Sequence, residues 1–214
     1  MKYIVDFDGT ITDIWNRYYR VYIDALNINE NECKFEEYKK NKLLYVNDRK
    51  MIESTTAKQD ITYEVFRNTK KAILESEDYL RLDQLIIDPD ILKKFFLDND
   101  ALILTIRRNE KLFYDQMTWL GIDSLRERTV VLKPSGTNSK RDWCRKIDDE
   151  YWIVGDSETD MLVGKNKNAH TCFVKSGLRD SIYIQRYICP EKIVDNVESF
   201  IKMNYEVSLS NESN

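Results

Sequence analysis

The chain has 214 residues and a formal net charge of −4, and 42% of its residues are hydrophobic. This length suits one domain, or one domain with a smaller inserted one, and with six glycines and three prolines the composition excludes a collagen-like or Pro/Gly-rich disordered chain. The charge gives no global attraction to nucleic acid or anionic membranes, and no apolar run approaches the ~18–20 residues of a membrane helix.

Short apolar runs recur along the chain and predict buried strands. The first, Tyr3-Ile4-Val5, runs into a tight turn at residues 6–10. An acid as early as position 6 does not fit a signal peptide, so we expect a cytoplasmic location. The other predicted strands are residues 101–105, 129–133, 151–154, 170–174 and, marginally, 192–194.

Helical patterns separate these strands. Residues 112–120 follow a 3.6-residue period and stop at Gly121, Ser139 is expected to cap a short helix, and residues 158–168 predict another. Because strands and helices alternate, the fold class is predicted to be α/β. We expect a Rossmann-like parallel sheet with helices on both faces.

Residues 14–98 break the alternation, because only helical patterns occur there. We therefore expect an inserted α-helical subdomain at 14–98, an α/β core made of 1–13 and 99–203, and a loosely ordered polar tail at 204–214. Packing within the insert is the favoured role of its first aromatic side chains, and an aromatic surface above a site is the alternative. These side chains are Trp15, Tyr18, Tyr19 and Tyr22.

Two pairs of carboxylates follow predicted strands. Asp6 and Asp8 lie where the first strand ends, and both can project from the carboxyl edge of the sheet, where open α/β sheets bind ligands. Such a pair suits a nucleophile with an acid/base, or a metal site. Asp156 and Asp160 follow the fourth strand one helical turn apart and can converge, although helix capping also accounts for acids in these positions.

The other candidates are weaker when taken singly. Thr105 ends the second strand, and Lys140 lies near the start of a short helix. The single histidine, His170, is expected to be packed, and the four cysteines lie far apart without a C-x-x-C pair. Any catalysis must therefore rest mainly on carboxylates.

Taken together and in this order, these motifs resemble the haloacid dehalogenase (HAD) superfamily. Within it, the sequence looks like the phosphoglycolate-phosphatase-like phosphatases, which carry a helical cap between the first and second motifs. The resemblance covers residues 1 to about 203. It implies that Asp6 is a nucleophile and Asp8 a general acid/base. It further implies that Thr105 binds phosphate and that Lys140 is the third-motif lysine. Asp156 and Asp160 would form the acidic fourth motif.

The third motif has two candidate lysines. Lys133, followed by Pro134, matches a form of this motif in which Lys-Pro ends the third strand. Lys140 matches the form in which the lysine starts a helix and apolar residues follow three and four positions later. We prefer Lys140.

The resemblance also implies a magnesium site. Four carboxylates and a phosphate ester crowd more negative charge than one lysine offsets, and oxygen ligands without histidine favour Mg²⁺. Asp6 and Asp156 are expected to ligate through their side chains, Asp8 through its backbone carbonyl, and Asp160 directly or through water. The crowding is also expected to keep the Asp8 carboxyl protonated.

The predicted function is Mg²⁺-dependent hydrolysis of a small phosphate monoester through an aspartyl-phosphate on Asp6. Thr105, Lys140 and Arg107 are the candidate substrate contacts, although Arg107 and Arg108 also suit a solvated helix start. The alternatives are a phosphotransferase such as a hexose-phosphate mutase and a non-catalytic binding domain. A dehalogenase is disfavoured, because that branch lacks an acid/base at the position of Asp8. The expected partner is a small phosphorylated metabolite, without nucleic acid or membrane, bound by a monomer or weak homodimer.

Overall fold

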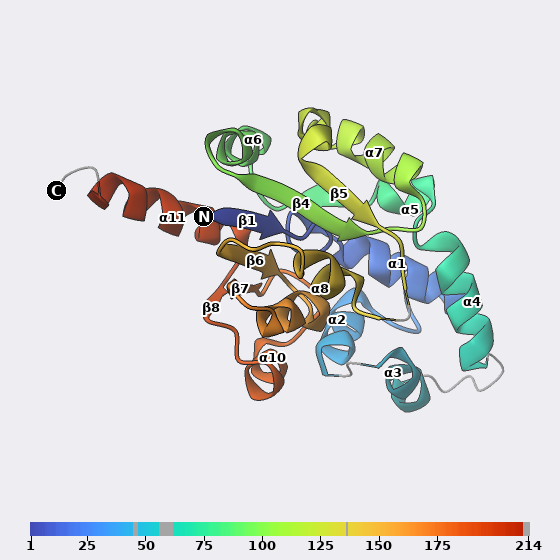
Figure 1. Ribbon diagram of the computed structural model, residues 1–214. Coiled ribbons are helices and arrows are strands. Elements are labelled where there is room, and N and C mark those ends of the chain that lie inside the picture. The colour runs from blue at the N-terminus through green and yellow to red at the C-terminus, as the bar shows by residue number, and fades with distance from the viewer. Residues whose placement is uncertain (45–46, 56–61, 136, 212–214) are drawn as a thin grey trace.

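The computed structural model describes residues 1–44, 47–55, 62–135 and 137–211. Its central feature is a sheet of six parallel strands in the order β5-β4-β1-β6-β7-β8 (Figure 1). The strand bounds are β1 Lys2–Val5, β4 Ala101–Ile106, β5 Thr129–Leu132, β6 Tyr151–Gly155, β7 Ala169–Val174 and β8 Lys192–Val194. Each predicted strand is present, and the expected α/β fold with a Rossmann-like sheet is confirmed.

Helices cover both faces of the sheet. Neighbouring residues of a strand face opposite sides, so an apolar strand presents apolar side chains to both layers of helices. Val5 packs in one core and Ile4 in another. The Val5 side is covered by α6 Pro89–Asp98, α7 Glu110–Trp119, the 3₁₀ helix η1 Asp123–Arg128 and α11 Val197–Asn211. The Ile4 side is covered by α8 Ser139–Cys144, α9 Glu158–Met161, the 3₁₀ helix η2 Leu162–Lys165 and α10 Ser181–Tyr187.

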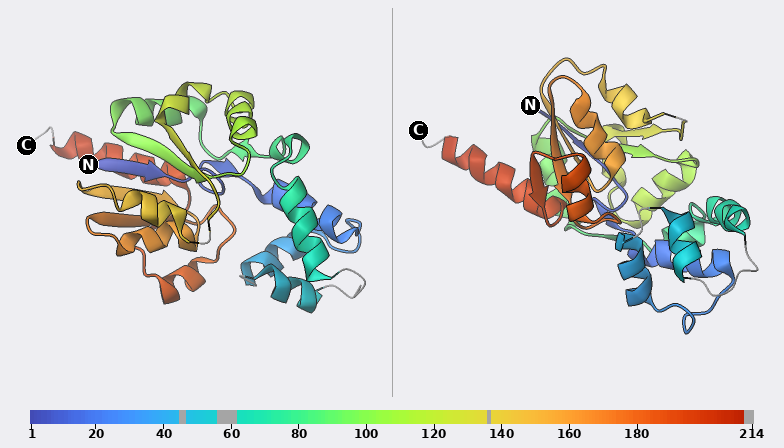
Figure 2. Two further views of the ribbon diagram at one scale, coloured as in Figure 1. Left: turned by 45° about the vertical axis from the view of Figure 1, so that its right-hand side comes forward. Right: turned by 90° about the horizontal axis from the view of Figure 1, so that it is seen from below.

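A separate group of helices, which we call the cap, lies beyond the carboxyl edge of the sheet (Figures 1 and 2). Its helices are α1 Trp15–Leu26, α2 Phe35–Leu44, α3 Asp48–Thr55, α4 Tyr63–Ile73 and α5 Glu77–Leu80. Two short antiparallel strands, β2 Thr12–Asp13 and β3 Gln84–Leu85, pair where the chain enters and leaves the cap. Trp15, Tyr19 and Tyr22 pack inside it, which is the favoured role of these aromatic residues. Tyr18 is partly buried against the same cluster and also lines a cavity, as the alternative role requires.

The expected cap boundary at residue 98 lies too far along the chain, because α6 packs on the core. Asp88 caps this helix, and its carboxylate accepts hydrogen bonds from the amides of Asp90 at 2.8 Å and Ile91 at 3.2 Å. Phe95 and Phe96 of α6 are buried in the same cluster as Val5. A helical period shows that a helix has an apolar face, but it does not show which layer that face covers.

The last helix also extends beyond the expected boundary at residue 203. The tail is predicted to be loosely ordered from residue 204, but α11 continues to Asn211, and residues 212–214 lie outside the described residues. Phe200 and Ile201 anchor this helix in the core, and neither glycine nor proline follows to end it. Neither α11 nor another helix in the described part of the chain is long and apolar enough to cross a membrane.

Candidate active site

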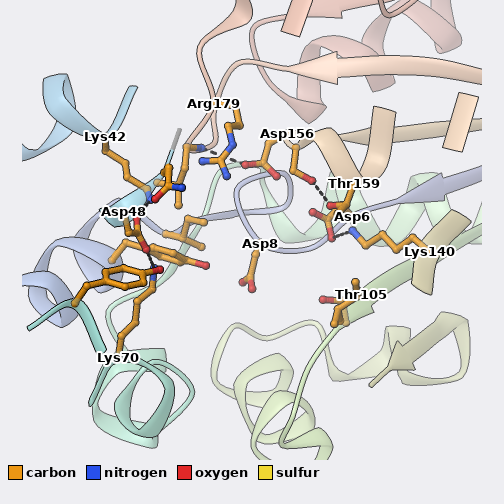
Figure 3. A pocket seen from close by; sticks show the side chains of 17 residues that line it. Asp6, Asp8, Lys42, Asp48, Lys70, Thr105, Lys140, Asp156, Thr159 and Arg179 are labelled. Atoms are coloured by element: carbon orange, nitrogen blue, oxygen red, sulfur yellow. Dashed lines mark hydrogen bonds and ion pairs between the residues drawn. The ribbon is translucent and has the colours of Figure 1, made fainter. Parts of the chain in front are cut away.

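The candidate site is a cavity of about 570 Å³ at the carboxyl edge of the sheet (Figure 3). Strand β1 lies between β4 and β6, so the residues at the ends of these three strands are brought together. Five of the polar residues singled out in the sequence line the cavity, namely Asp6, Asp8, Thr105, Lys140 and Asp156, and the aromatic Tyr18 lines it as well. Asp160 is fully buried and contacts Lys140.

Lys140 is held between two carboxylates. Its Nζ lies 2.6 Å from Asp6 Oδ1 and 2.6 Å from Asp160 Oδ1. Burial disfavours the charged amine, but Asp160 and Asp6 outweigh this effect and raise the pKa of Lys140. Helix α8 positions the lysine, and its N-cap is Asn138 rather than the expected Ser139, since the Asn138 side chain accepts a hydrogen bond from the Arg141 amide at 3.0 Å.

Lys133 lies in a different environment from Lys140. Its side chain is 61% exposed, and its Nζ lies 3.7 Å from Glu110 Oε2 and 3.4 Å from the Arg108 carbonyl oxygen. Of the two candidate lysines, Lys140 lines the cavity and Lys133 does not.

Asp6, Asp156 and Asp160 form a buried carboxylate cluster, with one oxygen of each within 4.8 Å of the others. Burial and the charge of Asp160 raise the pKa of Asp6 to about 7. Burial and the charge of Asp6 raise the pKa of Asp156 well above its ordinary value. Three carboxylates share the one positive charge of Lys140, and this excess of negative charge adds to the effect of burial on both pKa values. A donor set made only of carboxylate oxygens fits a hard divalent cation.

Backbone amides and two glycines hold the acidic fourth motif in place. Asp156 Oδ2 accepts a hydrogen bond from the Leu178 amide at 3.1 Å, and Asp160 Oδ2 accepts one from the Ser157 amide at 3.2 Å. A Cβ atom at Gly155 would overlap the Asp160 carboxylate, and one at Gly177 would overlap that of Asp156. Glycine at these two positions leaves room for the carboxylates.

Asp8 is bound by two arginines. Its Oδ1 lies 2.6 Å from Arg17 Nη2, on cap helix α1, and 2.5 Å from Arg107 Nη2, just after β4. Burial opposes ionisation, but Arg107 and Arg17 outweigh it and lower the pKa of the Asp8 carboxyl. The structure thus differs from the expected protonated Asp8. The sequence argument counted the neighbouring carboxylates but had no means of placing two guanidinium groups on this side chain.

A buried polar network continues behind these arginines. Arg107 Nη2 donates to Gln116 Oε1 at 3.2 Å, and Gln116 Nε2 donates to Asp83 Oδ2 at 2.7 Å. Arg17 Nε lies 3.1 Å from Asp83 Oδ1, as an ion pair without hydrogen-bond alignment. Burial raises the pKa of Asp83 to about 7, in spite of the charge of Arg17. No motif pointed to Arg17, Asp83 or Gln116.

The expected substrate contact Arg107 therefore lies elsewhere than predicted. Its side chain is 2% exposed and does not line the cavity. Arg108, which follows it, is 43% exposed and lies 3.4 Å from Glu75. The structure brings Arg107 to Asp8 rather than to the cavity wall.

Comparisons with known proteins agree with this fold. Residues 135–200 match the HAD-hydrolase-like family. A predicted phosphoglycolate phosphatase from Haemophilus somnus superposes with a TM-score of 0.67 at 16% identity, over 95% of this chain and 97% of that one. The chain has the HAD fold. A predicted phosphatase from Clostridium acetobutylicum gives a TM-score of 0.67 at 14% identity, over 96% and 98% of the two chains.

A HAD-like family hydrolase from Streptococcus pneumoniae also superposes, with a TM-score of 0.63 at 15% identity over 94% of this chain and 97% of that one. A search of curated proteins found no significant match. The resemblance drawn from the motifs is thus confirmed by the HAD-like family match and by the HAD fold. At these identities the solved structures establish the fold alone.

The burial of Arg107 beside Asp8 can be tested by comparing it with Arg108, the exposed arginine that follows it. Arg107→Ala should lower the free energy of unfolding by about 3 kcal/mol, at the lower end of the cost of breaking a buried ion pair, because Asp8 keeps Arg17. Arg108→Ala should lower it by about 0–1 kcal/mol, since that ion pair is exposed. Urea unfolding of both variants measures the difference, and equal losses would contradict the assignment of Arg107 to the buried network.

Proposed function

We propose that this chain is a Mg²⁺-dependent phosphatase that hydrolyses a small phosphate monoester through an aspartyl-phosphate on Asp6. The observation that carries this proposal is the convergence of Asp6, Asp8, Thr105 and Lys140 on one cavity, beside the carboxylate cluster. The HAD-like family match and the similarity to solved phosphatases support it. The cavity, at about 570 Å³, has the size of a site for a small organic ligand.

In the first step, an Asp6 oxygen attacks phosphorus while the bond from phosphorus to the ester oxygen breaks. Asp8 donates a proton to that leaving oxygen. A phosphate dianion bound beside Asp8 raises the pKa of its carboxyl against the pull of the two arginines, so that the proton is available. Lys140 and Thr105 stabilise the phosphoryl oxygens as their charge redistributes.

In the second step, Asp8 takes a proton from water, and the water oxygen bonds to phosphorus. The bond between phosphorus and Asp6 breaks, which releases phosphate and restores the Asp6 carboxylate. Mg²⁺, held by the side chains of Asp6 and Asp156, by the Asp8 carbonyl and by Asp160 directly or through water, would neutralise charge on the phosphoryl group.

The oligomeric state, the cytoplasmic location and the lack of nucleic acid partners stay predictions from the sequence.

The metal requirement has a pH dependence that follows from the raised pKa of Asp6. A carboxyl group must lose its proton to ligate Mg²⁺, so protons compete with the metal below the Asp6 pKa of about 7. Mg²⁺ should therefore raise the thermal unfolding temperature more at pH 8 than at pH 6. Asp156→Asn should abolish this shift, and Asp195→Asn, on the surface, should preserve it. Full phosphatase activity after thorough chelation would refute the Mg²⁺ requirement.

The two lysines can be separated by their effect on turnover. Lys140→Ala should lower kcat for an aryl phosphate by roughly a hundredfold, as expected for a lost transition-state charge partner. Lys133→Ala should change kcat little, because Lys133 lies outside the cavity. Circular dichroism and thermal unfolding of both variants control for misfolding. The opposite order of effects would move the third motif to Lys133.

The covalent intermediate tests the proposed reaction itself. An aryl leaving group of low pKa hardly needs protonation, so Asp8→Asn should still form aspartyl-phosphate but should hydrolyse it slowly. Mass spectrometry after an acid quench should then find phosphate on the peptide that contains Asp6. The same pulse should leave Asp6→Asn unmodified.

Two outcomes would change this assignment. If Asp8→Asn turns over aryl and sugar phosphates at wild-type rates, Asp8 is not the acid/base. If the wild-type intermediate passes its phosphoryl group to a sugar hydroxyl rather than to water, the chain is a phosphotransferase. Measuring free phosphate and phosphorylated sugar in the same assay distinguishes these reactions.

A further inference from the structure

A second group of charges lines the same cavity from the cap side. We call Lys42 of α2, Asp48 of α3 and Lys70 of α4 the cap charge cluster. Asp48 accepts a hydrogen bond from Lys42 through Oδ1 and another from Lys70 through Oδ2, the latter at 2.6 Å. Figure 3 shows this cluster on the far side of Asp8 from Asp6 and Lys140.

One positive charge of the cap charge cluster has no carboxylate within the cluster to offset it. Asp48 is a single carboxylate between two ammonium groups. Arg179 also lines the cavity, but Glu158 holds it through contacts of 2.7 and 2.8 Å and offsets its charge. The Lys42 and Lys70 ammonium groups therefore share one positive charge at the cavity wall that no carboxylate among the described residues offsets.

Burial makes this charge costly. The Lys42 side chain is 5% exposed and that of Lys70 is 22% exposed. Burial and the charge of Lys70 lower the pKa of Lys42 to about 8, in spite of Asp48. A buried charge without a full partner is unfavourable, and an anion entering the cavity would supply that partner.

The rest of the cavity wall suits the carbon part of a ligand. Apolar and aromatic side chains contribute to it, namely Ile14, Tyr18, Tyr63 and Leu178. A volume of about 570 Å³ is that of a site for a whole organic molecule rather than for a phosphate group alone. The cavity therefore joins a phosphate-reacting end, an apolar wall and a cationic end.

We propose that the substrate carries a second anionic group, a carboxylate or a phosphate, remote from the phosphate that is cleaved, and that Lys42 and Lys70 bind it. This inference rests on the proposed phosphatase function and names the substrate class for it. The single unbalanced positive charge of the cap charge cluster matches a carboxylate better than a phosphate dianion. If the two lysines only hold the cap helices together, the enzyme has no preference for a second anion.

Hydrolysis of matched pairs tests this preference. Each pair consists of two phosphate esters of equal length. One is the ester of an ω-hydroxy acid with two to six carbons, and the other is the ester of the corresponding ω-hydroxy amide, which has the same shape without the carboxylate charge. For at least one length, kcat/KM should be about tenfold or more higher for the acid. Diol bisphosphates against the corresponding diol monophosphates form the second arm, which shows whether phosphate serves in place of carboxylate.

Variants of the two lysines, with a control on helix α2, assign the preference to the cluster. Lys42→Met and Lys70→Met should each reduce the acid-to-amide ratio of kcat/KM at least about fivefold. Lys40→Met, exposed on the same helix as Lys42, should leave the ratio at its wild-type value. A ratio is used because it is independent of the fraction of active protein. Undiminished ratios in both folded cluster variants would overturn the assignment to these lysines.

Binding of phosphonates separates this inference from the catalytic proposal. Phosphonates with an ω-carboxylate or an ω-carboxamide are not hydrolysed, and their affinity for the full chain with Mg²⁺ is measured by calorimetry. Tighter binding of the carboxylate member, by about tenfold, supports the inference even if no ester is hydrolysed. Hydrolysis of esters with equal rates and equal phosphonate affinities within each pair overturns the inference and leaves the phosphatase proposal standing. Equal affinities without any hydrolysis overturn both.

Discussion

The site depends on how the protein offsets the charge of carboxylates that the fold brings together. Asp6 follows β1 and Asp156 follows the neighbouring strand β6, so parallel pairing places both acids at one edge of the sheet. Asp160 joins them from the first turn of α9. Like charges at such distances cannot all stay ionised without a counter-charge. The buried Lys140 supplies one, with both oxygen contacts at 2.6 Å.

The positions of Lys140, Gly155 and Gly177 follow from this crowding. Lys140 reaches the cluster because Asn138 caps a helix that starts close to the acidic edge. The two glycines give way to the Asp156 and Asp160 side chains, where any Cβ atom would overlap them. The motifs predicted that Lys140 and the acidic residues meet, but they did not predict that Gly155 and Gly177 leave room for the carboxylates. The strands could be predicted because their apolar runs are short and end in polar turns.

Other features could not be predicted, because they are properties of packing between distant segments. Arg17 and Arg107 are 90 positions apart, and each contacts Asp8 only through the fold. Helix α6 has the same apolar period that a cap helix would have, and only its contacts with the sheet assign it to the core. Lys42 and Lys70 look like ordinary surface lysines in the sequence, yet they face the cavity.

Asp8 connects the chemistry to the cap, since Arg17 belongs to the first cap helix and also contacts Asp83 at the end of the cap. The pKa values of the two neighbouring acids differ in opposite directions from their ordinary values: that of Asp6 is raised and that of Asp8 is lowered. The proposed reaction needs the reverse, an ionised nucleophile at Asp6 and a proton on Asp8. A cation beside Asp6 lowers its pKa, and a phosphate dianion beside Asp8 raises that of Asp8. The proposed metal and substrate would therefore each correct one of the two protonation states, so that the site becomes reactive only when both are bound.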